Sequence, residues 1–443
     1  MRRLTALLMF LLTLLLLLSP VSAQALAEAT VPSQSSSRSK AKTQEAKPQE
    51  ARPQQARPVI LRRDPKIVDV ELEVALTLFD SPVLDSNGVN VIPERFRFPS
   101  IEVAIPVLTR TSWFDTDFAP LAASVFVDGR ESKLEAGKVF SKTGAGVEAL
   151  LRFQGTVDQP ATSLRFVGRY STQRWKLEID RERAAQATWP REWPQWTQRY
   201  LGKELGIDPE DPVTKEVAEK AIDGGVRSVT PYVAAQGVIQ RVLGRWRAMT
   251  GAASELAPDG SLRGMRFTTG ESPGLAVGRG TPVELATTCV SALRAIGIPS
   301  RIVYGITDAN LRQRDRGDED ERRSRARGGL TFRYICEFYL PEIGWIPFDP
   351  IEMRGAGAGS RTSIGPIKGF ADVTDIEAVL PLAVAPVPVG FERADRYAVW
   401  GWKIGGGSVI DSEQSYSGIK LRETGRGNGK PPVAPAPTQD ETP

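Results

Sequence analysis

The sequence predicts an α+β protein in which an antiparallel β-domain precedes a domain of helices packed on a small antiparallel sheet. Residues 65–185 contain short runs of alternating apolar and polar side chains, separated by turn signals such as Asp128-Gly129. This pattern is typical of an antiparallel sandwich or barrel. Beyond residue 185 the apolar side chains change to helical spacing and then return to strand-like runs. Strands followed by a separate set of helices and strands indicate the α+β class.

The expected strands of the first domain share an alternation of apolar and polar side chains. In the first of them, Val68, Val70 and Leu72 alternate with Asp69 and Glu71. A period of two places one face of a strand toward a core and the other toward solvent. The expected strands span residues 66–76, 100–107, 124–127, 147–153, 164–170 and 175–179.

A segment rich in tryptophan and proline opens the second domain, which we predict over residues 186–356. Trp189, Trp193 and Trp196 fit aromatic packing at the junction of the two domains, and a ligand platform is the alternative interpretation. Two amphipathic helices are expected next, over residues 213–222 and 231–246.

The helix and strand patterns of apolar side chains become weaker toward the C-terminus. We expect a strand-containing extension over residues 357–425, with strand-like pieces at 378–389 and 397–404, and a disordered tail over 426–443. Within the second domain, residues 312–327 alternate basic and acidic side chains without an apolar face. We expect this stretch to be a solvated loop.

The first 23 residues have the features of a secretory signal peptide. Arg2 and Arg3 precede an apolar run over residues 4–18, and Val21-Ser22-Ala23 matches a cleavage motif. The run is shorter than a typical membrane span. We therefore expect an exported protein, in the periplasm, in the cell envelope or outside the cell, with no transmembrane segment in the mature chain.

The basic character of the chain is concentrated before its folded body. Residues 24–64 are rich in Gln, Ala, Pro and Lys and lack apolar periodicity, so we predict a disordered basic linker. Of the formal net charge of +4, the signal supplies +2 and residues 24–63 supply +5, which leaves −3 on the remainder. A slightly acidic body gives no support to nucleic-acid binding.

The chain contains no histidine. Histidine is the usual base in Ser-His and Cys-His catalysis and the commonest transition-metal ligand. Its absence argues against those chemistries, so we expect neither a bound metal nor a cofactor. The two cysteines, Cys289 and Cys336, lie in apolar runs, where buried, inert thiols are expected and a disulfide is the alternative.

Two strings in the second domain carry a family resemblance. Residues 280–301, GTPVELATTCVSALRAIGIPSR, predict a helix that leads into a strand at 302–305. Residues 332–350, FRYICEFYLPEIGWIPFDP, predict two strands joined by a turn at 342–344. Together they resemble the transglutaminase-like superfamily in its bacterial exported form, over about residues 190–352. The resemblance implies a cysteine-protease-type fold and amide hydrolysis or acyl transfer by Cys, His and Asp.

The catalytic positions that the resemblance implies are degenerate. The nucleophile position falls on Pro282 and the histidine position on Arg333, and only the acid remains, as Asp349. Proline has neither a thiol nor a backbone N–H, and an arginine side chain does not give up its proton at ordinary pH. We therefore assign no catalytic residue.

These substitutions have a structural interpretation. Thr281, Pro282 and Glu284 form the sequence of a capping box with proline at the first helical position. We also hypothesise that Arg333 and Asp349 replace the His–Asp interaction with an ion pair, the alternative being that Arg333 points to solvent.

The sequence thus predicts a catalytically inactive transglutaminase-like protein. The former substrate cleft, with Glu284, Arg333, Trp345 and Asp349, is expected to bind a peptide, a protein or a cell-envelope component. One alternative is an active amide hydrolase or acyltransferase that uses a non-standard cysteine, and another is a structural envelope protein with no ligand. The oligomeric state stays open.

Overall fold

The computed structural model describes the chain from Pro58 onward, with gaps, and the described residues belong to one compact unit. The predicted signal peptide, the loop at 312–327, the tail and all but the last residues of the predicted linker lie outside this description. The described residues are 58–78, 83–84, 90–91, 96–132, 135–143, 146–257, 259–268, 274–308, 329–361, 365–386, 398–405 and 415–425.

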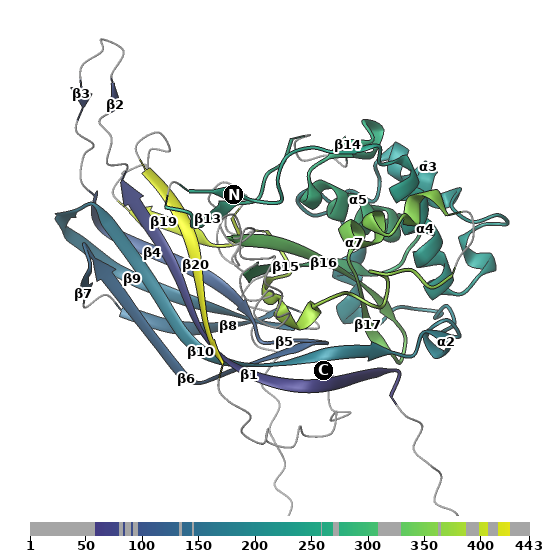
Figure 1. Ribbon diagram of the computed structural model, residues 1–443, viewed down its shortest axis with the longest axis horizontal. Helices are drawn as coiled ribbons and strands as arrows, with labels where there is room; N and C mark the ends of the chain where they lie inside the picture. The colour runs from purple at the N-terminus through teal and green to yellow at the C-terminus, as the bar shows by residue number, and fades with distance from the viewer. Residues whose placement is uncertain are drawn as a thin grey trace, which may run out of the picture. The chain divides into compact units, whose positions relative to one another are not determined.

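The β-domain contains two antiparallel sheets (Figure 1). The larger sheet has the order β12 (Glu255–Leu256), β13 (Leu262–Gly264), β20 (Ser415–Gly425), β1 (Ile60–Leu78), β10 (Ser163–Ile179), β6 (Phe114–Val127) and β5 (Arg110–Thr111), with β7 (Arg130–Ser132) also on β6. The smaller sheet has the order β19 (Gly401–Gly405), β4 (Phe96–Leu108), β9 (Gly146–Ala161) and β8 (Glu135–Thr143). A short separate hairpin pairs β2 (Val83–Leu84) with β3 (Asn90–Val91).

The two sheets pack face to face through their apolar positions. Phe153 on β9 and Phe166 on β10 meet edge to face, with ring centroids 5.4 Å apart. Val70, Leu72 and Val74 on β1 are almost fully buried, as their period-two spacing predicts. The apolar faces that this alternation creates therefore hold the two sheets together.

A third antiparallel sheet forms the second domain. Its order is β17 (Gly344–Phe348), β16 (Leu330–Leu340), β15 (Ser300–Asp308) and β18 (Leu380–Ala383). The helix α5 (Pro282–Ala295) packs on β15 and β16 and also contacts α3 (Pro212–Glu219), α4 (Pro231–Arg245) and α7 (Pro350–Gly355). Figure 1 shows these helices grouped together beside the sheet. The predicted α+β class is confirmed.

Short and irregular elements complete the described chain. They are α2 (Arg181–Ala184), the β11 (Ala248–Met249) and β14 (Arg279–Gly280) pair, and the 3-10 turns η1 (Gln195–Leu201), η2 (Val226–Ser228), η3 (Gly274–Ala276), η5 (Ala358–Ser360) and η6 (Ile376–Ala378). Within the described residues, no helix combines the length and the apolar character that crossing a membrane requires.

Local patterns predicted most elements well. The turn at Asp128-Gly129 forms, with both residues at positive φ, as the tight hairpin between β6 and β7 requires. The strands expected separately at 164–170 and 175–179 are one continuous strand, β10. The helices α3 and α4 begin with a proline after the side-chain caps Asp211 and Thr230. The helix α5 also begins with a proline, after Thr281, whose backbone N–H donates to Glu284.

Strand pairing crosses the predicted domain boundaries at three places. The first strand begins at Ile60, inside the predicted linker, because residues 60–63 pair with the far end of β10. Two strands of the predicted extension pair with other parts of the chain: β18 joins the third sheet, whereas β20 pairs along β1. From the second domain, β13 pairs with β20. In each case the edge of one strand is paired with a strand that is distant in sequence.

Close backbone contact between α4 and η5 gives a test of this packing. A Cβ on Gly359 would lie 2.6 Å from the carbonyl carbon of Leu243 and 2.7 Å from the amide nitrogen of Gly244. Backbone atoms cannot move aside as a flexible side chain can, so we expect Gly359→Ala to lower the free energy of unfolding by about 1–3 kcal/mol. Urea denaturation measures this change.

The matched control is Gly355→Ala at the end of α7. A Cβ there meets no described atom within 4 Å. We expect this variant to be neutral or more stable, by up to about 1 kcal/mol. Equal unfolding midpoints for the two variants would contradict the packing argument.

Candidate functional site

The first turn of α5 is built around the carboxylate of Glu284. The backbone N–H of Thr281 donates to Glu284 Oε2 at 2.6 Å. The amide and hydroxyl of Thr268 donate to the same carboxylate at 2.6 and 2.9 Å. Glu284 is only 1% exposed. Glu284 was predicted to line a ligand cleft, but its carboxylate instead caps the helix and fixes residue 268 beside it.

Pro282 occupies the first position of α5, as the sequence indicates. This position needs no backbone N–H for the helix, so proline fits without loss of a hydrogen bond. The same position offers neither a nucleophilic side-chain atom nor an amide hydrogen. The start of α5 is therefore suited to helix stability.

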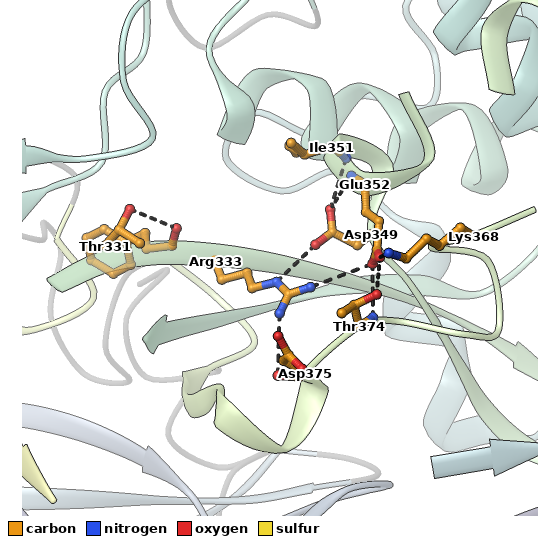
Figure 2. Close-up of polar contacts among 9 residues, drawn as sticks. Thr331, Arg333, Asp349, Ile351, Glu352, Lys368, Thr374 and Asp375 are labelled. Atoms are coloured by element: carbon orange, nitrogen blue, oxygen red, sulfur yellow. Dashed lines mark hydrogen bonds and ion pairs between the residues drawn. The ribbon is translucent and has the colours of Figure 1, made fainter. Parts of the chain in front are cut away.

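Arg333 and Asp349 form the predicted ion pair (Figure 2). Arg333 lies on β16, and its Nε atom is 3.0 Å from Asp349 Oδ2. Asp349 follows β17 and caps α7, because its Oδ1 atom accepts the N–H groups of Ile351 and Glu352 at 2.9 and 3.1 Å. One carboxylate thus orients the arginine and begins a helix. The side chains of Arg333 and Asp349 are 13% and 7% exposed, so the pair is largely shielded from solvent.

A second carboxylate, Glu352, extends this pair. Arg333 Nη2 lies 3.7 Å from Glu352 Oε2, and Arg333 Nη1 donates to the carbonyl oxygen of Asp375 at 3.5 Å. Glu352 also accepts the N–H of Thr374 at 3.0 Å and pairs with Lys368 Nζ at 3.6 Å. Figure 2 shows these side chains converging between β16, α7 and the segment that follows α7.

We call Arg333, Asp349, Glu352, Lys368 and Thr374 the Arg333 network. It joins the third sheet to α7 and to residues 368–375 of the predicted extension. Glu352 was not among the residues predicted from the sequence. One sequence feature could have identified it. Glu352 lies three residues after Asp349, in the first turn of the helix that Asp349 caps, where acidic side chains are favoured.

Trp345 lies away from this network. It pairs with Tyr339 across β16 and β17, and Tyr339 is about 20 Å along the strand from Arg333 at the usual rise per residue. The guanidinium of Arg301 stacks over the Trp345 ring at 4.1 Å. Arg301 also forms a fully buried ion pair with Glu337, at 2.7 Å. The prediction that Trp345 lines a cleft with Arg333 is therefore wrong: Trp345 covers a buried charge pair.

The predicted tryptophan cluster is a packing element, but it lies on the third sheet and not at the domain junction. Trp193 and Trp196 contact the Tyr339 ring, with centroids 6.4 and 4.9 Å away. Trp196 also reaches Trp345 at 6.2 Å. Trp189 donates its indole N–H to the carbonyl oxygen of Val229 at 2.7 Å. These contacts fix η1 and its approach onto β16 and β17.

Both cysteines are free and fully buried. Burial raises the pKa of the Cys289 thiol and that of the Cys336 thiol well above the ordinary range. Cys336 Sγ faces the carbonyl oxygen of Ala286 on α5 at 3.8 Å. Nucleophilic cysteines need the thiolate form and access to substrate, and neither thiol has them. Among the described residues, no group of three or more Cys, Asp or Glu side chains is arranged to hold a metal ion.

The Arg333 network links β16 to α7, so its loss should lower the stability of the protein. Arg333→Met would leave Asp349 largely buried without its cation and Glu352 with Lys368 alone. We expect the free energy of unfolding to fall by about 3 kcal/mol, at the lower end of the range for breaking a buried pair. Urea denaturation followed by tryptophan fluorescence measures this loss.

An exposed pair supplies the control. Arg63 and Glu178 form an ion pair at 2.9 Å with both side chains more than half exposed. Removing such a pair typically changes stability by less than about 1 kcal/mol. If Arg63→Met and Arg333→Met cost the same, Arg333 does not hold these elements together.

Comparisons with known proteins identify one family that part of this region resembles. Residues 269–350 match the model of the transglutaminase-like superfamily. A structure from Cytophaga hutchinsonii, named a putative cysteine protease, aligns with 83% of this chain and 92% of its own at 11% identity and a TM-score of 0.46. A structure named a putative protease, from Parabacteroides distasonis, aligns with 57% of this chain and 41% of its own at 14% identity and a TM-score of 0.21. No curated protein matches the chain. The segment that carries α5, Arg333 and Asp349 is thus similar to the transglutaminase-like superfamily.

Proposed function

We propose that this chain is an exported, noncatalytic transglutaminase-like protein that binds a peptide, a protein or a cell-envelope component. The observation that carries the proposal is the ion pair of Arg333 with Asp349. It occupies the positions where the resemblance places a catalytic histidine and its orienting acid. A guanidinium stays protonated at any ordinary pH and so cannot serve as a general base.

The start of α5 supports the same conclusion independently. Pro282 provides neither the thiol of a nucleophile nor an N–H to stabilise an oxyanion. Glu284, two residues further along, accepts hydrogen bonds from Thr281 and Thr268. Two separate changes, one on the helix and one on the sheet, each remove a requirement of Cys–His chemistry.

The alternative of an active enzyme with a non-standard cysteine receives less support. Cys289 and Cys336 are completely buried, and burial raises the pKa of both thiols. Substrate would have to reach a sulfur enclosed between α5 and β16. We therefore favour recognition without turnover.

The residues at the expected cleft leave no open side chains for a ligand. The residues first expected to form a cleft are engaged by other protein groups and are at least four-fifths buried. A binding role therefore needs a surface elsewhere. A pocket between α2, α4 and residues 365–370 supplies one, and it favours a binding role over a purely structural one.

Thiol modification combined with an activity assay tests the noncatalytic proposal. We expect the full-length protein to show no hydrolysis of peptide amides and no acyl transfer to primary amines. Iodoacetamide at pH 8 should modify neither cysteine in the folded protein and both in guanidinium chloride, because unfolding exposes the thiols. Mass spectrometry counts the adducts. Turnover that disappears on alkylation of one cysteine would contradict the proposal.

Export is tested separately in a producing cell. Cleavage at the predicted site should yield a mature chain that begins after Ala23, in the exported fraction. Leu11→Arg places a charge in the apolar run and should retain the uncleaved chain inside the cell. N-terminal sequencing of each fraction measures both outcomes. An uncleaved wild-type chain confined to the cytoplasm would contradict export.

A further inference from the structure

A pocket of about 220 Å³ lies where α2, the first turns of α4 and residues 365–370 meet. Its apolar lining includes Val233 of α4 and, from the opposite wall, Ile367 and Phe370. Pockets for drug-sized ligands usually measure about 300–1,000 Å³. This cavity is smaller, so it suits one side chain better than a cofactor.

Two polar groups lie within this apolar lining. Tyr232 is only 5% exposed, and its ring packs on Phe370 with centroids 5.1 Å apart. Its hydroxyl has no hydrogen-bond partner among the residues that the structure describes. The amide nitrogen of Gln236 donates to the carbonyl oxygen of Gly365, which leaves the Gln236 amide oxygen as an acceptor. Neither the Tyr232 hydroxyl nor the Gln236 amide oxygen is a fully buried atom without a partner, so both oxygens remain open to a group of a ligand.

The Tyr232 hydroxyl stays protonated at physiological pH. Burial raises the pKa of Tyr232 to about 12, with the positive charge of Arg181 acting in the opposite direction. The group can therefore both donate and accept a hydrogen bond. A peptide backbone, which presents an N–H and a carbonyl oxygen, matches that capacity.

The charges at the rim also indicate a neutral ligand group. Arg181 is neutralised by Asp372, with Nη2 and Oδ2 2.8 Å apart, and Glu182 adds a further exposed carboxylate. This rim does not favour a carboxylate or phosphate. An uncharged peptide segment with an apolar side chain fits it better.

The Arg333 network holds the wall of this pocket. Lys368 and Thr374 bind Glu352 from either side of Phe370. The backbone N–H of Asp349 also donates to the carbonyl oxygen of Gly369 at 2.8 Å. Gly369 has φ +87°, and a Cβ there would lie 2.8 Å from the amide nitrogen of Met353. The pair at the former catalytic positions therefore fixes the segment that closes the pocket.

A larger pocket of about 360 Å³ on the β-domain lacks these properties. Its polar lining groups bond to one another: Arg169 pairs with Glu71 at 2.7 Å, and the hydroxyl of Ser171 donates to Asp69 at 2.6 Å. The smaller pocket is the better candidate for a ligand.

We propose that the pocket between α2, α4 and residues 365–370 receives a single apolar side chain, of leucine to phenylalanine size, from a peptide or protein partner. The neighbouring backbone groups of the partner bond to the Tyr232 hydroxyl and the Gln236 amide oxygen. This inference rests on the proposed binding function and gives it a location and a ligand class.

Neutral amino-acid amides are the probes. N-acetyl-L-phenylalaninamide and N-acetyl-L-leucinamide should bind the full-length protein saturably in saturation-transfer NMR, with dissociation constants in the millimolar range. N-acetyl-L-alaninamide should bind at least about tenfold more weakly, since it buries less apolar surface.

Variants of pocket residues test whether the probes bind in this pocket. Val233→Trp fills the cavity and should abolish saturable binding of the phenylalanine probe. Tyr232→Phe removes only the hydroxyl and should weaken binding by about five- to tenfold. Tyr339→Phe, a half-buried tyrosine outside the pocket, is the matched control and should leave binding unchanged. Circular dichroism and urea midpoints establish that each variant is folded.

The outcomes separate this inference from the proposed function. Absence of saturable binding to the wild type, or equal binding by a folded Val233→Trp variant, overturns the pocket inference. Hydrolysis of the probe amides, visible as new NMR resonances, overturns the noncatalytic function even if the pocket binds. Binding without hydrolysis, lost in Val233→Trp and weakened in Tyr232→Phe, supports both.

Discussion

The charge of Arg333 must be neutralised within a largely buried site, and much of the second domain is arranged around that requirement. An unpaired buried cation is strongly unfavourable. Asp349 and Glu352 supply the counter-charges from the first turn of α7, and Asp375 supplies a carbonyl oxygen. Because these groups come from three parts of the chain, one guanidinium fixes a strand, a helix and the segment after it.

Residues at the catalytic positions of the resemblance thus have structural roles in this protein. Pro282 begins α5, Glu284 caps it, and Arg333 pairs with the acid that caps α7. A second ion pair, between Arg301 and Glu337, lies beneath Trp345 on the same sheet. Buried pairs of this kind specify geometry more reliably than they add stability. The core is consequently built to hold one arrangement.

This arrangement connects the degenerate site to the proposed binding pocket. Glu352 binds Thr374 and Lys368, and the backbone of Asp349 binds Gly369. Those contacts position Phe370 opposite Tyr232. Under the proposed noncatalytic function, the residues at the positions that the resemblance marks as catalytic would help to shape a recognition surface.

The sequence by itself determined the elements whose signals are local. The alternation around Val70, the proline at the start of α5 and the hairpin after Leu340 each follow from neighbouring residues, and the Arg333–Asp349 pair followed from the resemblance. Only the tertiary structure decided that β20 pairs with β1, that Trp345 lies far from Arg333, and that Tyr232 opens into a pocket. Strand pairing across hundreds of residues, and the face on which a side chain meets its neighbours, depend on contacts that no local pattern encodes.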